Sequence, residues 1–233
     1  MKLLQYSCKT PKENIAIDEY LLQEVNIGAY SDGICRIWES NQVFVVMGLS
    51  KSLNQDVHEI ACLRDRIDIL KRCSGGGTVL QGPGCFNYSY ILPVSHHQQL
   101  QSVSSTTAYV LSLVQTTLAS LIPNTQQKGI SDLVINDLKF SGNAQRRIKH
   151  AVLFHGTILY NFDVSLITKY LKEPIDQPVY RHHRHHRDFI QNIGITKDQL
   201  ISLFSAKTNG FIPISDIKIP KTFIDKVTFR SPN

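Results

Sequence analysis

The fold is decided by residues 132–160, which read DLVINDLKFSGNAQRRIKHAVLFHGTILY. Asp132 to Ile135 has the composition of a strand, and Asn136-Asp137 supplies the polar turn residues of a β-hairpin. Residues 138–145 then predict the returning strand, which carries Lys139. The sequence therefore places a lysine within a strand of the sheet.

A second polar turn over 146–150 leads into 151–160, an apolar run that is typical of a central strand and is interrupted by His155-Gly156-Thr157. Three strands thus meet around Lys139. Elsewhere, predicted strands cluster and predicted helices flank them without regular alternation of the two. This pattern favours an α+β fold with a mainly antiparallel sheet flanked by helices.

Toward the N-terminus, Thr10 to Glu13 has the form of a capping box with proline at the first helical position, which predicts a helix to about Asn26. Strands over 34–38 and 43–47 are expected to form a hairpin through the polar turn 39–42. The helix is expected to face the core with Ile15, Ala16, Tyr20, Leu21 and Val25. Further strands are expected at 67–70 and 86–92, an amphipathic helix over 100–121, and short elements at 197–205 and 217–227.

The composition fits one globular domain over residues 1–233, with 42% hydrophobic and 19% charged residues. A net charge of +6 suits nucleic acid, an anionic cofactor or an acidic protein partner, and charge alone does not choose among them. The chain has no run of 18 apolar residues and no leader pattern, so we expect a cytoplasmic protein without membrane contact. Its five scattered cysteines are expected to be free thiols.

A glycine-rich stretch, Arg72-Cys73-Ser74-Gly75-Gly76-Gly77-Thr78, follows a predicted strand. Unhindered backbone N–H groups can converge there on an anion while Arg72 adds a positive charge, although a flexible turn is an equal alternative. The spacing fits neither a Walker loop nor a dinucleotide fingerprint. A second tight turn at 81–84 forces the chain back beside the first.

Lys139 is followed by Ser141-Gly142-Asn143-Ala144, whose small side chains permit a ligand to approach closely. A lysine on this kind of strand is by itself more often a solvated surface residue. The small neighbours favour a ligand site instead.

These motifs resemble those of one enzyme family. Residues 72–79 resemble the R-x-S-G-G-G-x-V signature of lipoate-protein ligases, and Asp132 with 139–145 resembles their D-L and K-F-S-G-x-A-x signature. Residues 155–159 are similar to the family's H-G-T-I-L strand, and 14–22 to its first helix. The resemblance implies the biotin/lipoyl protein ligase catalytic fold, and the form of the motifs fits lipoate better than biotin.

The resemblance implies two-step chemistry in which ATP and lipoate or octanoate give an acyl-adenylate, and a lysine of a lipoyl domain then takes the acyl group. Lys139 would stabilise developing negative charge as the central electrophile, and Asp132 would orient Lys139 or hold Mg²⁺. Acceptors would be the lipoyl domains of 2-oxoacid dehydrogenase E2 subunits or the glycine cleavage H protein. The residues expected to bind the acyl-adenylate are Arg72, Ser74, Gly75, Gly76, Gly77, Thr78, Gly82, Asn87, Asp132, Ser141, Gly142, Ala144, His155, Gly156 and Thr157.

Two features depart from the ligase pattern. The Gly82-Pro83-Gly84 turn is closer to octanoyltransferases of the same superfamily, which use a cysteine nucleophile and a thioester donor. Cys73 and Cys85 are the thiols near the site, and both are more typical of packing residues. About seventy residues follow 155–157, so we expect no C-terminal accessory domain; adenylation would then use a separate accessory chain, or the enzyme would transfer a preformed acyl-adenylate.

The basic stretch 180–187, YRHHRHHR, permits a metal site if His182, His185 and His186 share a helical face. The flanking arginines oppose a cation, so a basic surface for ATP or an acidic carrier domain is favoured. The alternative from another functional class is a nucleic-acid-binding protein. The positive net charge supports this alternative, and the absence of a recognised nucleic-acid-binding motif opposes it.

Overall fold

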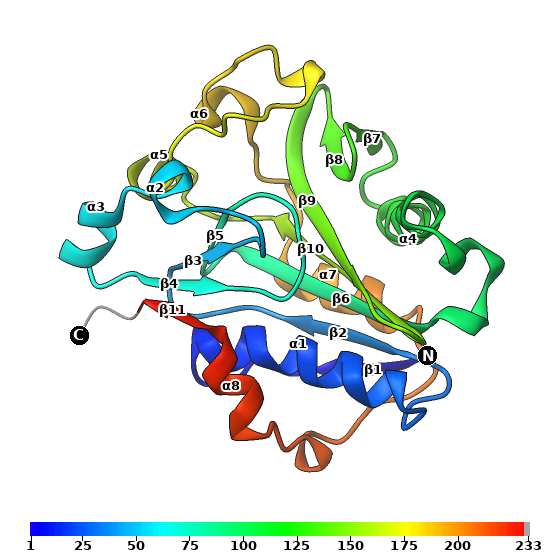
Figure 1. Cartoon of the computed structure of the whole chain (residues 1–233). Helices are drawn as coiled ribbons and strands as arrows, with labels where there is room; N and C mark the ends of the chain where they lie inside the picture. Colours follow the sequence, from blue (N-terminus) through cyan, green and yellow to red (C-terminus); the bar gives the residue numbers. More distant parts are fainter. Residues whose placement is uncertain (231–233) are drawn as a thin grey trace.

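The computed structural model describes residues 1–230 and shows an α+β fold with two sheets (Figure 1). Neighbouring strands of the seven-stranded sheet are antiparallel except for the first pair, which is parallel. The expected mainly antiparallel sheet is confirmed. In spatial order this sheet contains β1 (Lys2–Gln5), β2 (Ile34–Trp38), β6 (Cys85–Pro93), β10 (Ala151–Leu159), β9 (Leu138–Arg147), β8 (Asp132–Ile135) and β7 (Gln126–Lys128).

The second sheet is smaller, and in it β3 and β4 are parallel while the other neighbours are antiparallel. Its strands, in spatial order, are β11 (Thr228–Arg230), β4 (Asp68–Lys71), β3 (Phe44–Met47) and β5 (Val79–Gln81). The glycine-rich stretch is the connection from β4 to β5. The predicted hairpin through 39–42 is wrong, because β2 and β3 belong to different sheets and this turn carries the chain from one to the other.

Helices cover both faces of the larger sheet (Figure 1). The helix α1 (Pro11–Asn26), with α8 (Lys221–Val227) against it, packs on one face, and α4 (Val103–Leu118) with α7 (Lys197–Ser205) packs on the other. The shorter helices are α2 (Leu53–Asp56), α3 (Glu59–Arg64), α5 (Ser165–Tyr170) and α6 (His186–Phe189), with 3₁₀ turns η1 (Val94–His96), η2 (Gln98–Gln101), η3 (Val179–Arg181) and η4 (Ile214–Asp216). No helix among residues 1–230 has the length and apolar character needed to cross a membrane.

Side chains along β6 point alternately to the two faces of the sheet, so one face receives aromatic residues and the other a polar residue. Phe86, Tyr88 and Tyr90 enter the core on the α4 and α7 side, where their rings lie 5.3, 5.3 and 6.5 Å from the ring of Phe204. Ser89 belongs to the opposite face and donates to a carboxylate of α1. The candidate site lies on this second, more polar face.

The capping box that starts α1 is confirmed, since Glu13 N donates to Thr10 Oγ1 and Thr10 N donates to Glu13 Oε2. The predicted inner face of this helix is wrong in part. Ile15 and Tyr20 are only partly buried, whereas the polar residues Asn14 and Asp18 are buried. The buried face of this helix therefore contains polar side chains, although the sequence pattern predicted apolar ones.

Candidate active site

The hairpin that carries Lys139 is confirmed, and an irregularity in it aims the lysine. Asn136 and Asp137 have φ of 51° and 62°, as a type I′ hairpin turn requires. Farther along, Lys139 opposes Val134 and Ser141 opposes Leu133, so two steps of β9 match one step of β8. Such a β-bulge changes the side to which a side chain points.

The ammonium of Lys139 is held over the strand by an aspartate. Nζ lies 2.7 Å from Asp132 Oδ1, and its side chain remains 28% exposed. A methyl group at Gly142 would lie 3.0 Å from both Cε and Nζ of Lys139, so the lysine lies directly against Gly142. The second oxygen of Asp132 accepts a hydrogen bond of 2.7 Å from the hydroxyl of Tyr180.

A strip of small residues continues from this lysine along β9 and β10. Gly142 opposes Thr157 and Ala144 opposes His155 in the ladder, and all four are only partly buried. The predicted residue Ser141 is instead buried and accepts a hydrogen bond of 3.3 Å from Asn143. The strip is therefore an open floor beside the lysine.

The glycine-rich loop stands over the other end of the floor. A methyl group at Gly76 would lie 3.3 Å from Cβ of Ala144, and the φ of 86° at Gly76 favours glycine. Gly48, after β3, approaches so closely that a methyl group there would lie 2.1 Å from the carbonyl oxygen of Gly76. The loop is thus fixed between the two sheets.

Arg72 lies inside this loop and braces it. Its Nη2 donates to the carbonyl oxygens of Gly75 and Gly77 at 2.5 and 2.8 Å, and its Nε donates to Ser74 Oγ at 2.9 Å. The residue is only 7% exposed, and burial lowers the pKa of the guanidinium to about 10, so it stays charged near neutral pH. The sequence predicted that the Arg72 guanidinium faces a bound anion. In the structure it faces the carbonyl oxygens of the loop instead.

The amide groups of this loop are in the opposite situation. Within residues 1–230, the N–H groups of Gly75, Gly76 and Gly77 make no hydrogen bond, although the carbonyls of Gly75 and Gly77 are both satisfied. Gly75 and Gly77 also face open space. Successive unpaired amides of this kind can form a nest for an anion.

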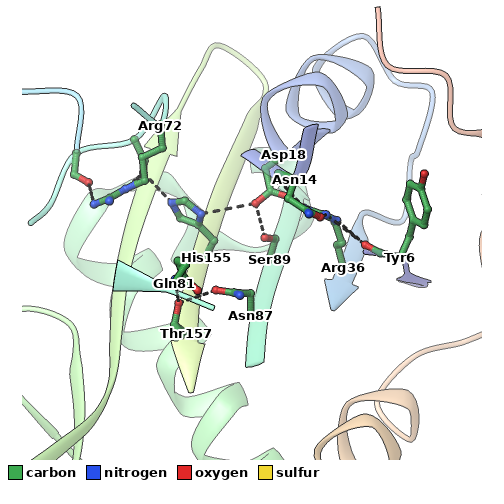
Figure 2. Close-up of polar contacts among 12 residues, drawn as sticks. Tyr6, Asn14, Asp18, Arg36, Arg72, Gln81, Asn87, Ser89, His155 and Thr157 are labelled. Atoms are coloured by element: carbon green, nitrogen blue, oxygen red, sulfur yellow. Dashed lines mark hydrogen bonds and ion pairs between the residues drawn. The ribbon is translucent and has the colours of Figure 1, made fainter. Parts of the chain in front are cut away.

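A buried polar chain links this loop to α1 (Figure 2). Ser74 Oγ lies 2.7 Å from His155 Nε2, and His155 Nδ1 lies 3.6 Å from Asp18 Oδ2. Asp18 in turn accepts 2.7 Å from Arg36 Nη1 and 2.6 Å from Ser89 Oγ. Because the carboxylate faces Nδ1, we infer that Nδ1 carries the imidazole proton and that Nε2 accepts the Ser74 hydroxyl.

The two charged groups of this buried hydrogen-bond network, on Asp18 and Arg36, neutralise each other in the core. Arg36 is 0% exposed and also donates to Asn14 Oδ1 at 2.7 Å and to the carbonyl of Tyr6. Burial raises the pKa of Asp18, but the charge of Arg36 and the contact with His155 outweigh burial and hold that pKa below 3.8. Asp18 is therefore ionised at neutral pH.

The order serine, histidine, aspartate has the form of a catalytic triad, but Ser74 is not placed as a nucleophile. Its side chain is wholly buried, and its Oγ already accepts the Nε–H of Arg72. A nucleophile must reach its substrate. The chain of contacts therefore anchors the loop.

Thr157 and Asn87 continue this floor, whereas Gly156 faces the opposite side of the sheet. Gln81 Nε2 donates to Thr157 Oγ1, and Thr157 donates to Asn87 Oδ1, each at 2.6 Å (Figure 2). A methyl group at Gly156 would lie 1.8 Å from Asn143 Oδ1, which accepts from the hydroxyl of Tyr88.

Two predicted residues lie apart from this floor. Thr78 donates to Asp56 of α2. Gly82 packs against Val43, since a methyl group at Gly82 would lie 3.0 Å from Val43 Cγ2. A surface hollow of about 630 Å³, lined by residues such as His58, Ile60 and Lys172, includes none of the predicted site residues.

The cysteines do not offer a thiolate. All five are free, as predicted. Burial raises the pKa of Cys73 to about 12 and raises that of Cys85 above its ordinary 9.0. Both thiols thus remain protonated near neutral pH.

The helical face expected for His182, His185 and His186 is wrong, because His182 and His183 have left-handed φ of 51° and 58° and interrupt any helix. A carboxylate missing from the sequence argument, Glu173, pairs with Arg181 and accepts from the backbone N–H of His186 at 3.2 Å. Among residues 1–230, no group of three or more His, Cys, Asp or Glu side chains is arranged to hold a metal ion.

Residues 10–203, which include the lysine, the glycine loop and the histidine, match the family model of the lipoyl protein ligase A/B catalytic domain. The chain belongs to this family. The family resemblance and the fold predicted from the sequence are thus confirmed.

Proteins named lipoate-protein ligases share moderate identity with the chain. It is 32% identical over 161 residues to the Mycoplasma pneumoniae protein named "Probable lipoate-protein ligase A", with 69% of this chain and 46% of that protein covered. It is 28% identical over 162 residues to lipoate–protein ligase 1 of Staphylococcus aureus, with 70% and 47% covered. The chain spans about half the length of these relatives.

Solved structures of this family share the fold. A crystal structure of a lipoate-protein ligase A bound with ATP superposes with a TM-score of 0.77 at 19% identity, covering 97% of this chain and 94% of that one. The bi-partite lipoate protein ligase of Thermoplasma acidophilum, from a study that included its E2 lipoyl domain, gives 0.73 at 18% identity, covering 97% and 92%.

Sequence reasoning missed three residues that shape this family member's site: Asp18, Arg36 and Tyr180. A signal existed for the first two, because each is a charged residue within an apolar helix or strand pattern, which requires a buried partner. No comparable local signal marks Tyr180. Its partner Asp132 lies on a distant strand.

Proposed function

We propose that this protein is a lipoate-protein ligase, which activates lipoate or octanoate with ATP and transfers the acyl group to a lysine of a lipoyl domain. Family membership supports the proposal. One observation carries it: the Lys139 ammonium and the free amides of Gly75 to Gly77 border the same open strip of β9 and β10. That strip combines a fixed cation, an anion nest and a floor without bulky side chains.

In the first step, a carboxylate oxygen of the acid attacks the α-phosphorus of ATP and pyrophosphate leaves. In the second, the amine of the acceptor lysine attacks the acyl carbon, the bond from carbon to the phosphate oxygen breaks, and AMP leaves as the amine loses a proton. Lys139 stabilises the negative charge that develops on the carbonyl and phosphate oxygens. The glycine amides hold the same anionic group in place.

Arg72 acts indirectly in this proposal. Its guanidinium draws the carbonyls of Gly75 and Gly77 inward. It thereby fixes the loop conformation in which the amides remain unpaired. The positive charge still contributes to the local potential, but the contact with substrate is made by the backbone.

The residues do not fit a preformed Mg²⁺ site. Both oxygens of Asp132 are engaged, one by Lys139 and the other by Tyr180. Mg²⁺ favours octahedral oxygen ligands, and no cluster of acidic side chains among residues 1–230 supplies them. Orienting Lys139 is therefore the role we assign to Asp132.

The alternative enzyme takes its acyl group from a carrier thioester. That chemistry requires a thiolate nucleophile, and burial raises the pKa of Cys73 and Cys85 well above neutral pH. The ligase reaction is thus favoured. Direct use of a preformed acyl-adenylate would need the same lysine and loop, and a separate accessory chain could then supply the first step.

The experiment is mass spectrometry of a purified lipoyl domain, from an E2 subunit or from the glycine cleavage H protein, after incubation with this protein. Parallel reactions contain lipoate alone, lipoate with ATP and Mg²⁺, synthetic lipoyl-AMP, or octanoyl carrier protein. We expect a mass gain of one lipoyl group with ATP and with lipoyl-AMP. Acylation from the carrier thioester without ATP would contradict the ligase proposal, and a gain with lipoyl-AMP alone would restrict it to the transfer step.

A further inference from the structure

Tyr180 lies in the segment 174–189, which ends with α6 and passes beside the start of β9 (Figure 1). The residues directly after this segment are attached to the strand by their backbone, because Gln191 N donates to the carbonyl of Lys139 at 2.9 Å. Arg184 Nη2 donates to the carbonyl of Asp137 in the hairpin turn at 3.0 Å. The segment and the residues that follow it therefore contact the hairpin at Lys139 and at the turn before it.

The hydroxyl of Tyr180 completes the coordination of Asp132. It donates to Oδ2 at 2.7 Å, while Oδ1 lies 2.7 Å from Nζ of Lys139. One carboxylate thus joins a tyrosine and a lysine through its two oxygens. Burial and the charge of Asp132 raise the pKa of Tyr180 above its ordinary 10.0, so the phenol remains a donor throughout the neutral range.

The tyrosine ring is held by its surroundings. It packs against the ring of Phe189 with centroids 5.3 Å apart. Gly129, with φ of 59°, leaves room for the ring, since a methyl group there would lie 3.3 Å from Tyr180 Cε1. The next residue, Arg181, is buried and pairs with Glu173. The hydroxyl therefore has little freedom to leave Asp132.

We propose that Tyr180 is a positioning residue, whose hydroxyl fixes the Asp132 carboxylate in the rotamer that aims the Lys139 ammonium over Gly142. A carboxylate held at one oxygen rotates about its terminal torsion, which is broad. The paired ammonium would follow it away from the floor. Two partners at opposite oxygens remove this freedom.

The catalytic consequence of this role of Tyr180 rests on the proposed function. The ammonium must meet charge that develops during the reaction, so its placement should affect turnover more than substrate affinity. Tyr180 touches neither the floor nor the glycine loop in the described contacts. The expected defect of a variant is therefore in kcat.

The test compares Tyr180→Phe with Tyr170→Phe. Tyr170, the last residue of α5, supplies a matched control, because its hydroxyl donates at 3.0 Å to Asp65, which follows α3 away from the site. For each protein we would measure thermal unfolding, kcat and KM for lipoate and the lipoyl domain, and the rate at which an amine-reactive ester labels Lys139, by peptide mass mapping. The labelling rate reports the freedom of the lysine without any turnover.

For Tyr180→Phe we expect kcat to fall by about tenfold, as loss of one hydrogen bond to a charged group implies, with KM changed by less than about twofold. Labelling of Lys139 should become severalfold faster, and Tyr170→Phe should match the wild type in both. Unchanged Lys139 labelling in Tyr180→Phe would overturn the proposal, whatever happens to stability. If the wild type failed to acylate any lipoyl domain, the proposed function would fail, while the labelling comparison would still decide the role of Tyr180.

Discussion

Ser74 Oγ and His155 Nε2 lie 2.7 Å apart although the two residues are separated by 81 positions. The contact ties the glycine loop between β4 and β5 to the middle of β10, and so joins the smaller sheet to the larger one at the candidate site. It continues through Asp18 to the wholly buried Arg36. The position of the anion nest is therefore fixed from the core of the protein.

Replacing Ser74 with alanine should loosen this connection. The change leaves Arg72 Nε without its partner inside the loop, which costs about 1–3 kcal/mol of unfolding free energy. We expect a rise in KM for lipoate as well, because the loop loses its anchor to His155. Urea unfolding and steady-state kinetics measure both effects; Ser112→Ala, on the exposed side of α4, is the control and should change neither. Normal KM and stability in Ser74→Ala would refute the anchoring role.

Gly75→Ala and Gly77→Ala separate a requirement of the fold from a requirement of the ligand. A methyl group at either position meets nothing within 4 Å and neither has a positive φ, so unfolding free energy should change by less than about 1 kcal/mol. If the loop amides bind the acyl-phosphate group, the added methyl group obstructs them, and the KM for lipoate should rise by about tenfold or more. Gly194→Ala, also in open space, is the matched control. Unaltered KM in both loop variants would exclude the anion nest.

The ion pair of Asp18 predicts a pH-dependent contribution to stability. Its folded-state pKa lies below the ordinary 3.8, so the stabilisation is fully present above that value and is lost as pH falls through the folded pKa. Asp18→Asn leaves Arg36 buried without a counter-charge, which should cost about 3–5 kcal/mol at pH 7. In urea unfolding across pH, the difference from wild type should be constant from about pH 7 to pH 5 and shrink below about pH 4.

Two outcomes would count against this reading of Asp18. One is a difference between variant and wild type that grows as pH falls, and the other is a variant as stable as wild type at pH 7. The double variant Asp18→Asn with Arg36→Gln removes both charges. It should recover part of the lost stability, because no buried charge is then left unpaired.

Thiol reactivity should follow the raised pKa of the cysteines. Because the thiolate is the reactive species, iodoacetamide should modify Cys73 slowly at pH 7.5, with a rate that still rises about tenfold per pH unit near pH 10. A small free thiol, whose pKa is about 8.5, should level off by then. Cys73→Ser should retain full ligase activity. A trapped acyl-thioester on Cys73 would instead revive the transferase alternative.

Much of the fold could be predicted because its signals are local. The capping box at Thr10, the hairpin turn at Asn136-Asp137 and the apolar run of β10 each depend on a few neighbouring residues, and the structure confirms all three. The turn 39–42 was also detected. Its polar residues reveal that the chain turns, but the sheet that the next strand joins is decided by distant strands, so the predicted hairpin was wrong.

The candidate site could be proposed from the sequence as a set of residues, but not as a spatial arrangement. Lys139, the glycine loop and His155 do come together on one floor. The direction of Arg72 could not be predicted, because whether a guanidinium faces a ligand or the loop's own carbonyls depends on the surrounding packing. The partners Asp18 and Tyr180 stayed hidden for a similar reason, since each acts across elements far apart in sequence.

The central claim is that Lys139 supplies the charge that stabilises acyl transfer. The most direct measurement is a single-turnover reaction of synthetic lipoyl-AMP with a lipoyl domain, followed by quenching and mass spectrometry, for wild type and Lys139→Ala. Lys149→Ala, in the exposed turn between β9 and β10, is the control. We predict that Lys139→Ala remains folded and transfers at least about 100-fold more slowly, whereas the control keeps its rate. A Lys139→Ala protein that transfers the lipoyl group at the wild-type rate would contradict the mechanism.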